Sequence, residues 1–148
     1  DKIGLIDVFK FVLKKYESSG YKFDEIWYLA PCSPLIETLD LKRAAKYFNK
    51  NSKFNFMLAV SEYSPPIQWA FEKKNRGLKP KFSKYSKYRS QDLTKMFYDT
   101  GTFGAFKSSY FSGTKQNLIG FNIPRYKGID IDTKEDWLMA EKILKSKK

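Results

Sequence analysis

The sequence predicts an α/β fold, because segments with helical periodicity alternate with short apolar segments along the chain. In the first half the order is helix, strand, helix, strand, which is the spacing of a parallel sheet with helices on both faces. The length of 148 residues fits one domain, and a hydrophobic content of 42% can fill its core. We therefore expect residues 1–148 to form a single domain.

The first half of the chain has the clearest elements. An apolar stripe at intervals of three and four residues predicts an opening helix, and it consists of Leu5, Ile6, Phe9, Val12, Leu13 and Tyr16. The following residues predict a strand at 24–30, a turn at 31–34, a helix from about 38 to 48 and a buried strand at 54–60. Thr38 or Asp40 can cap the second helix.

Residues 64 to about 88 break this pattern. Long irregular segments in compact domains are often functional or form an interface, so we expect an arm that projects from the sheet. Regular structure returns with a strand near 102–106, a helix or turn near 107–112, a strand near 118–122 and a last helix over 133–145. The last helix carries Trp137, Ala140 and Leu144 on one face.

The composition excludes several classes of protein. The chain has no histidine, which removes serine and cysteine hydrolases that need imidazole and also zinc–histidine sites. Its one cysteine, Cys32, cannot form an internal disulfide, as is typical of a reducing compartment. The apolar runs are far shorter than the ~20 residues that span a bilayer. We expect a cytoplasmic protein without a membrane partner.

The positive charge is concentrated in one segment. The formal net charge is +12, and Lys73–Lys95 holds nine basic residues and one acid. This segment suits a ligand with phosphate or carboxylate groups, and a non-catalytic module that binds RNA or another polyanion is the alternative function. Only four of the 28 basic residues are arginine, the usual reader of nucleic acid, so nucleic acid is not the expected partner. An exposed, solvated arm explains the same charges.

Asp130 and Asp132 are the best candidates for a chemical site. In an extended segment, residues two apart point to the same side, so both carboxylates can bind one divalent cation. Mg²⁺ is commonly held by one or two carboxylates together with substrate phosphates. The alternative is structural, since Asp132 and Glu135 can form a capping box for the last helix. That alternative does not explain Asp130.

Arg89 and Gln91 form a second, weaker candidate site. The guanidinium group can bind a carboxylate in a fork, and the amide can bind hydroxyl groups. Surface ion pairing is the structural alternative for Arg89. The eight glycines are scattered and match no phosphate-binding loop, so the sequence contains no loop of that kind for a triphosphate.

Seven short motifs follow one another through nearly the whole chain. They are Leu5-Ile6-Asp7-Val8, Ala30-Pro31-Cys32-Ser33-Pro34-Leu35, Pro66-Ile67-Gln68-Trp69-Ala70, Arg89-Ser90-Gln91-Asp92-Leu93, Tyr98-Asp99-Thr100-Gly101-Thr102-Phe103, Ile123-Pro124-Arg125-Tyr126 and Asp130-Ile131-Asp132-Thr133-Lys134-Glu135-Asp136-Trp137. The last motif is the most specific. In this order they resemble the acylneuraminate cytidylyltransferase family, which makes CMP-activated nonulosonic acids, and within it the pseudaminic acid cytidylyltransferase branch.

The resemblance implies a Rossmann-like nucleotidyltransferase sheet and a magnesium-dependent reaction. A hydroxyl of the nonulosonic acid would attack the α-phosphate of CTP and release pyrophosphate. Asp130 and Asp132 match the metal-binding aspartates of the family. Arg89 and Gln91 fall in its sugar-side motif, and Arg125, a third substrate-binding candidate, precedes the metal-binding segment. Residues 64–88 correspond to the arm through which family members form homodimers.

The sequence departs from the family at two places. Sialic-acid-type members commonly have glutamine where Ala30 stands, which favours a different nonulosonic acid such as pseudaminic acid. Family members also begin with a strand and a basic, glycine-containing loop that hold CTP, and this sequence contains neither. The chain resembles the C-terminal two-thirds of the family, so we expect that it does not transfer CMP by itself.

Overall fold

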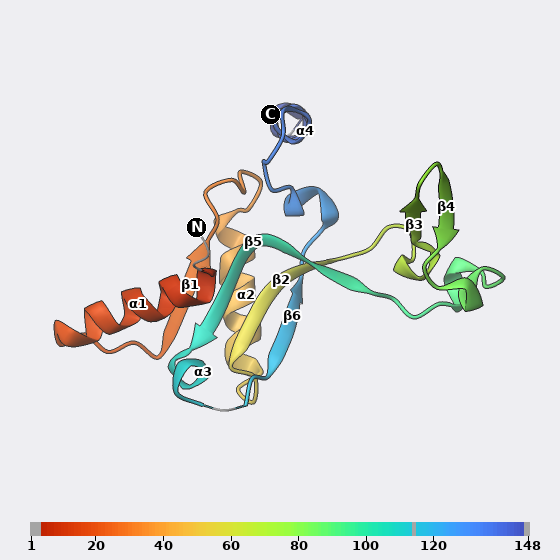
Figure 1. The fold of residues 1–148 in the computed structure, drawn as a ribbon. Helices are drawn as coiled ribbons and strands as arrows, with labels where there is room; N and C mark the ends of the chain where they lie inside the picture. The colour runs from red at the N-terminus through yellow and green to blue at the C-terminus, as the bar shows by residue number, and fades with distance from the viewer. Residues whose placement is uncertain (1–3, 114, 147–148) are drawn as a thin grey trace.

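The centre of the molecule is a four-stranded mixed sheet in the order β1–β5–β2–β6 (Figure 1). The computed structural model describes residues 4–113 and 115–146. Strands β1 (Glu25–Leu29), β2 (Phe56–Glu62) and β6 (Leu118–Asn122) run in one direction, and β5 (Phe97–Lys107) runs antiparallel to both of its neighbours. The α/β class is confirmed, but the sheet is mixed, whereas the spacing of the first elements indicated parallel strands.

The reversed direction of β5 follows from the path of the chain. The chain leaves β2 at Glu62, passes through a long excursion and returns to the sheet at Phe97, which pairs with Glu62. A strand that returns to the sheet at the end where the chain left it must run antiparallel, as in a hairpin. This pairing also explains why β5 begins well before the predicted strand at 102–106.

Helices cover both faces of the sheet. Trp27 of β1 packs edge-on against Phe48 of α2 (Thr38–Lys50), with ring centroids 6.4 Å apart. Tyr28, the next residue of β1, stacks on Phe9 of α1 (Leu5–Ser18) at 5.2 Å. Because consecutive residues of a strand point to opposite faces, α1 and α2 lie on opposite sides of the sheet. The short helix α3 (Ser108–Ser112) joins the α1 side through contacts with Phe106 of β5.

The main core lies between the sheet and α2. Its fully or nearly fully buried members are Ala44, Phe48, Met57, Ala59, Phe103, Ala105 and Ile123. On the other face, the ring of Tyr28 lies directly over β5 at Gly104. A Cβ atom on Gly104 would lie 2.6 Å from Cε1 of Tyr28 and 2.7 Å from the carbonyl oxygen of Met57. Only glycine allows this close approach.

Two helices differ in detail from the sequence predictions. Helix α2 is capped by Glu37 in a capping box with Asp40, whose Oδ2 accepts the Glu37 N–H at 3.0 Å, and not by Thr38. Helix α4 (Lys134–Ser146) has the predicted range but stands apart from the sheet (Figure 1). Ala140 is buried, whereas Trp137 is 59% exposed, so the apolar face of α4 is only partly covered.

Within the described part of the chain, no helix is long and apolar enough to cross a membrane.

We call residues 64–88 the arm. It contains the hairpin of β3 (Phe71–Lys74) and β4 (Gly77–Pro80), with short 3₁₀ turns at Ile67–Trp69 and Ser83–Tyr85. Figure 1 shows the hairpin projecting away from the central sheet, beyond the crossing point of β2 and β5. The sequence predicts a projecting segment here but not the hairpin.

Candidate functional site

Asp130 lies at the end of the sheet where β1 and β6 terminate. It follows the 3₁₀ turn η4 (Arg125–Gly128), which comes directly after β6. The Ile131 N–H donates to the carbonyl oxygen of Cys32 at 3.1 Å and so holds this segment beside the turn that follows β1. In α/β sheets, ligands bind at the carboxyl ends of the parallel strands, and Asp130 is at such an edge.

The carboxylate of Asp130 rests against the backbone of β5 at Gly101. Gly101 has a φ of +69°, which favours glycine, and a Cβ there would lie 3.2 Å from Oδ2 of Asp130. Burial raises the pKa of Asp130 above its ordinary value, and the charges of Asp132 and Asp136 raise it further. The carboxylates therefore repel one another, and a bound cation would offset this repulsion.

The capping box of α4 is one residue further along than the sequence suggested. Thr133 donates its N–H to Oδ2 of Asp136 at 2.8 Å, and the Asp136 N–H donates to Oγ1 of Thr133 at 3.2 Å. Hydrogen bonds from Thr133 lower the pKa of Asp136. The proposed box of Asp132 with Glu135 is wrong, so the cap does not require the carboxylate of Asp132.

Asp130 and Asp132 do not form a complete cation site by themselves. Among the residues that the structure describes, no group of three or more histidine, cysteine, aspartate or glutamate side chains could hold a metal ion. Asp130 and Asp132 supply two carboxylates, which matches the case in which the remaining ligands are phosphate oxygens and water.

Gln91 and Arg125 line two neighbouring hollows. The hollow of Gln91 has a volume of about 250 Å³ and that of Arg125 about 350 Å³, and both include residues Glu62, Tyr63 and Ser64. Arg89 lies on the surface, where its Nε is 3.3 Å from Oδ2 of Asp92. In the described structure, no hydrogen bond or ion pair joins Arg89, Gln91 or Arg125 to either aspartate.

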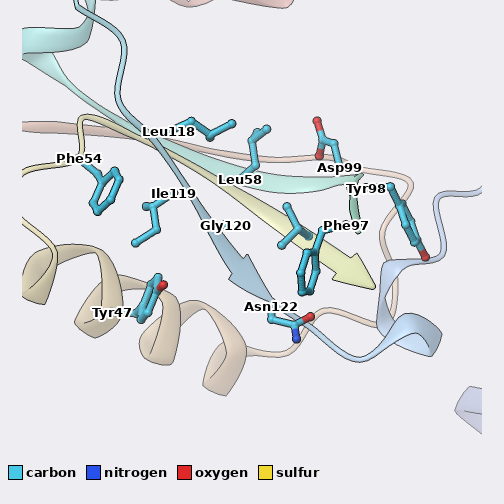
Figure 2. Close-up of a pocket in the computed structure, with 11 residues that line it drawn as sticks. Tyr47, Phe54, Leu58, Phe97, Tyr98, Asp99, Leu118, Ile119, Gly120 and Asn122 are labelled. Carbon is cyan, nitrogen blue, oxygen red and sulfur yellow. The ribbon is translucent and has the colours of Figure 1, made fainter. Parts of the chain in front are cut away.

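A larger hollow lies elsewhere. It has a volume of about 700 Å³ and is formed mainly by β2, β5 and β6 (Figure 2). Its lining is mostly apolar, Asp99 is the one charged residue among the lining side chains, and none of the predicted site residues belongs to it. Phosphate or sugar groups need polar and cationic partners, so the hollows beside residues 62–64 suit them better.

Comparison with known proteins finds two similar sequences. No protein-family model matches the chain. Two relatives, each named pseudaminic acid cytidylyltransferase, come from Campylobacter jejuni subsp. jejuni serotypes O:23/36 and O:2. Each is 32% identical over 140 residues that take in 87% of this chain. The chain is a partial homologue of these enzymes. It spans 57% of the length of each relative.

The structure also contains a buried lysine, Lys127, that no sequence motif indicates. Nζ of Lys127 lies 2.6 Å from Oδ2 of Asp40 and 2.9 Å from Oε2 of Glu37. Burial alone would lower the pKa of Lys127, but the hydrogen bonds and charges of the two acids outweigh it and raise the pKa. No sequence pattern separates this lysine from the others, because both acids lie in a distant part of the chain.

Proposed function

We propose that the chain provides the metal-binding and sugar-binding part of a cytidylyltransferase that transfers CMP from CTP to a nonulosonic acid, with pseudaminic acid as the best match. The observation that carries this proposal is the position of Asp130, which rests on Gly101 beside Asp132 at the carboxyl edge of the sheet. The names of the two relatives support the same activity.

In this proposal, a sugar hydroxyl oxygen bonds to the α-phosphorus of CTP while the bond to the β-phosphate breaks. Pyrophosphate leaves, and the hydroxyl proton passes to solvent. Asp130 and Asp132 would hold Mg²⁺, which neutralises charge on the phosphate oxygens when it is bound. Arg125 and Arg89 are suited to pair with the sugar carboxylate, and Gln91 is suited to bind its hydroxyl groups.

Binding of the product tests this proposal. Because the chain spans only part of its relatives, the measurement is calorimetric titration of the 148-residue chain with CMP-pseudaminic acid, with and without Mg²⁺. We expect binding that depends on Mg²⁺, since the two carboxylates repel a phosphate unless a cation lies between them.

A parallel titration with single-stranded RNA discriminates the alternative function. Salt-dependent and sequence-tolerant RNA binding, without binding of the CMP-sugar, would show that the basic segment Lys73–Lys95 defines a polyanion-binding module instead. Matching the ionic strength of the two titrations serves as the control.

We propose further that residues 1–148 form one domain and that the protein works in the cytoplasm. The first proposal is supported by the pairing of Glu62 with Phe97, which makes both ends of the long excursion part of one sheet. The second is supported by the single cysteine, Cys32, which suits a reducing compartment.

The arm is proposed to mediate a homodimer. Phe71 is 60% exposed on β3, and Ile67 and Trp69 lie just before it. Exposed aromatic side chains on a projecting hairpin are typical of a protein contact. We expect Phe71→Glu to convert the dimer to a monomer in sedimentation equilibrium, because a buried unpaired carboxylate opposes association.

Phe11→Glu is the matched control for this prediction. Phe11 is 69% exposed on α1, away from the arm, so the same change of charge should leave the association state as it is. A wild-type chain that is monomeric at every concentration tested would contradict the dimer.

A further inference from the structure

We infer that Lys127 is a positioning residue for the carboxylate site. By joining Asp40 and Glu37 at the start of α2, it fixes the path of residues 125–132, which carry Arg125, Asp130 and Asp132. The catalytic significance of this inference rests on the proposed function, whereas the fixing of the backbone does not.

Lys127 is buried together with Asp40, whereas the side chain of Glu37 is half exposed. The side chain of Lys127 is 9% exposed, that of Asp40 is also 9% exposed, and Lys127 alone is buried among the lysines that the structure describes. A charge can be buried only where opposite charges and hydrogen bonds replace water. Asp40 also takes part in the capping box of α2, where its Oδ2 accepts the N–H of Glu37. The ion cluster therefore links η4 to the first turn of a helix on the face of the sheet that holds the main core.

The ammonium group is not available to a substrate. Two of its N–H donors are directed to Asp40 and Glu37 at short distances, and little of the side chain reaches the surface. The cluster holds two negative charges and one positive charge, so it would not attract phosphate. A positioning role is the one that this geometry supports.

Two neutral hydrogen bonds hold the same segment on either side of Lys127. Oγ of Ser61 donates to the carbonyl oxygen of Ile123 at 2.8 Å, and the Ile131 N–H donates to Cys32 at 3.1 Å. Between these two points, Lys127 provides the ionic connection, three residues before Asp130. The contact of Asp130 with Gly101 depends on the path of these few residues, so it depends on Lys127.

Amide hydrogen exchange of the 148-residue chain tests the inference without any ligand. In Lys127→Met, we expect the Ile131 amide to exchange at least tenfold faster than in the wild type, while amides of β2 and β5 keep their protection. Lys127→Arg keeps the charge and the donors and should restore much of the protection. Lys145→Met is the matched control, since Lys145 is 70% exposed and pairs with Glu141 on the surface of α4.

Titration with Mn²⁺, monitored by electron paramagnetic resonance, measures cation binding at the carboxylate site. Weaker Mn²⁺ binding in Lys127→Met, together with faster exchange at Ile131, is the expected result. If the wild type binds no Mn²⁺, the proposed metal site fails, and the exchange experiment still decides the role of Lys127. Unchanged exchange at Ile131 in a folded Lys127→Met variant would overturn the inference. If that variant does not fold, Glu37→Gln replaces it, because this milder change must also speed exchange at Ile131.

Discussion

Asp130→Asn is expected to weaken the magnesium-dependent binding of CMP-pseudaminic acid by about a hundredfold, because loss of one preorganised electrostatic contact has an effect of this size. The same variant should unfold at the same temperature as the wild type or at a higher one. The folded state raises the pKa of Asp130, so the charged carboxylate destabilises the fold at neutral pH, and a neutral amide removes that cost. Calorimetry and thermal unfolding measure the two effects.

The opposite directions of these two effects make the prediction specific. Changing a residue that has only a structural role would lower the stability of the fold. Changing a ligand-binding residue that destabilises the fold raises the stability and weakens ligand binding. Asp24→Asn, at an exposed position just before β1, is the control and should change neither quantity. Full magnesium-dependent binding by Asp130→Asn would exclude the metal role of this residue.

Gly104→Ala is expected to lower the free energy of unfolding by about 3 kcal/mol, at the upper end of what overpacking costs. The new Cβ would meet the Tyr28 ring and the Met57 carbonyl oxygen at distances that real Cβ atoms essentially never show. Movement of Tyr28 cannot relieve the clash, because the Met57 contact is with the backbone of the neighbouring strand β2. Urea unfolding of the two proteins measures the difference.

Gly77→Ala is the matched control for Gly104. Its Cβ would lie 3.8 Å from the nearest atom, the carbonyl oxygen of Lys74, so we expect a change within about 0.5 kcal/mol. Equal stabilities of Gly104→Ala and Gly77→Ala would show that the sheet relaxes around the new methyl group.

Local patterns were sufficient for the helices and for three of the strands. The stripe from Leu5 to Tyr16 and the apolar segment before Pro31 depend on neighbours within a few residues, so periodicity finds them. The direction and full length of β5 depend on the pairing of Phe97 with Glu62, which no local pattern encodes. The arm hairpin was missed for a related reason, because its strands are short, lysine-rich and fully or largely exposed.

Part of the candidate site could be predicted from the sequence, and part of it could not. The spacing of Asp130 and Asp132 is visible in the sequence, and the structure places Asp130 at a strand-end edge against Gly101. The cap was misassigned by one residue because Asp132, Thr133, Glu135 and Asp136 offer two pairs with the same spacing. Lys127 was missed because its partners, Glu37 and Asp40, become its neighbours only when α2 and η4 pack together.

The arm emerges from the paired ends of β2 and β5, and this has a consequence for how freely its length can vary. The entropy lost in closing a loop grows only with the logarithm of its length, so each doubling costs about 0.6 kcal/mol. The sheet pairs up to Glu62 and Phe97 whatever lies between them. Insertions and deletions between these residues are therefore nearly neutral for the stability of the sheet. Evolution can remodel the arm, and with it the choice of partner, while the strand ends around Asp130 keep their arrangement.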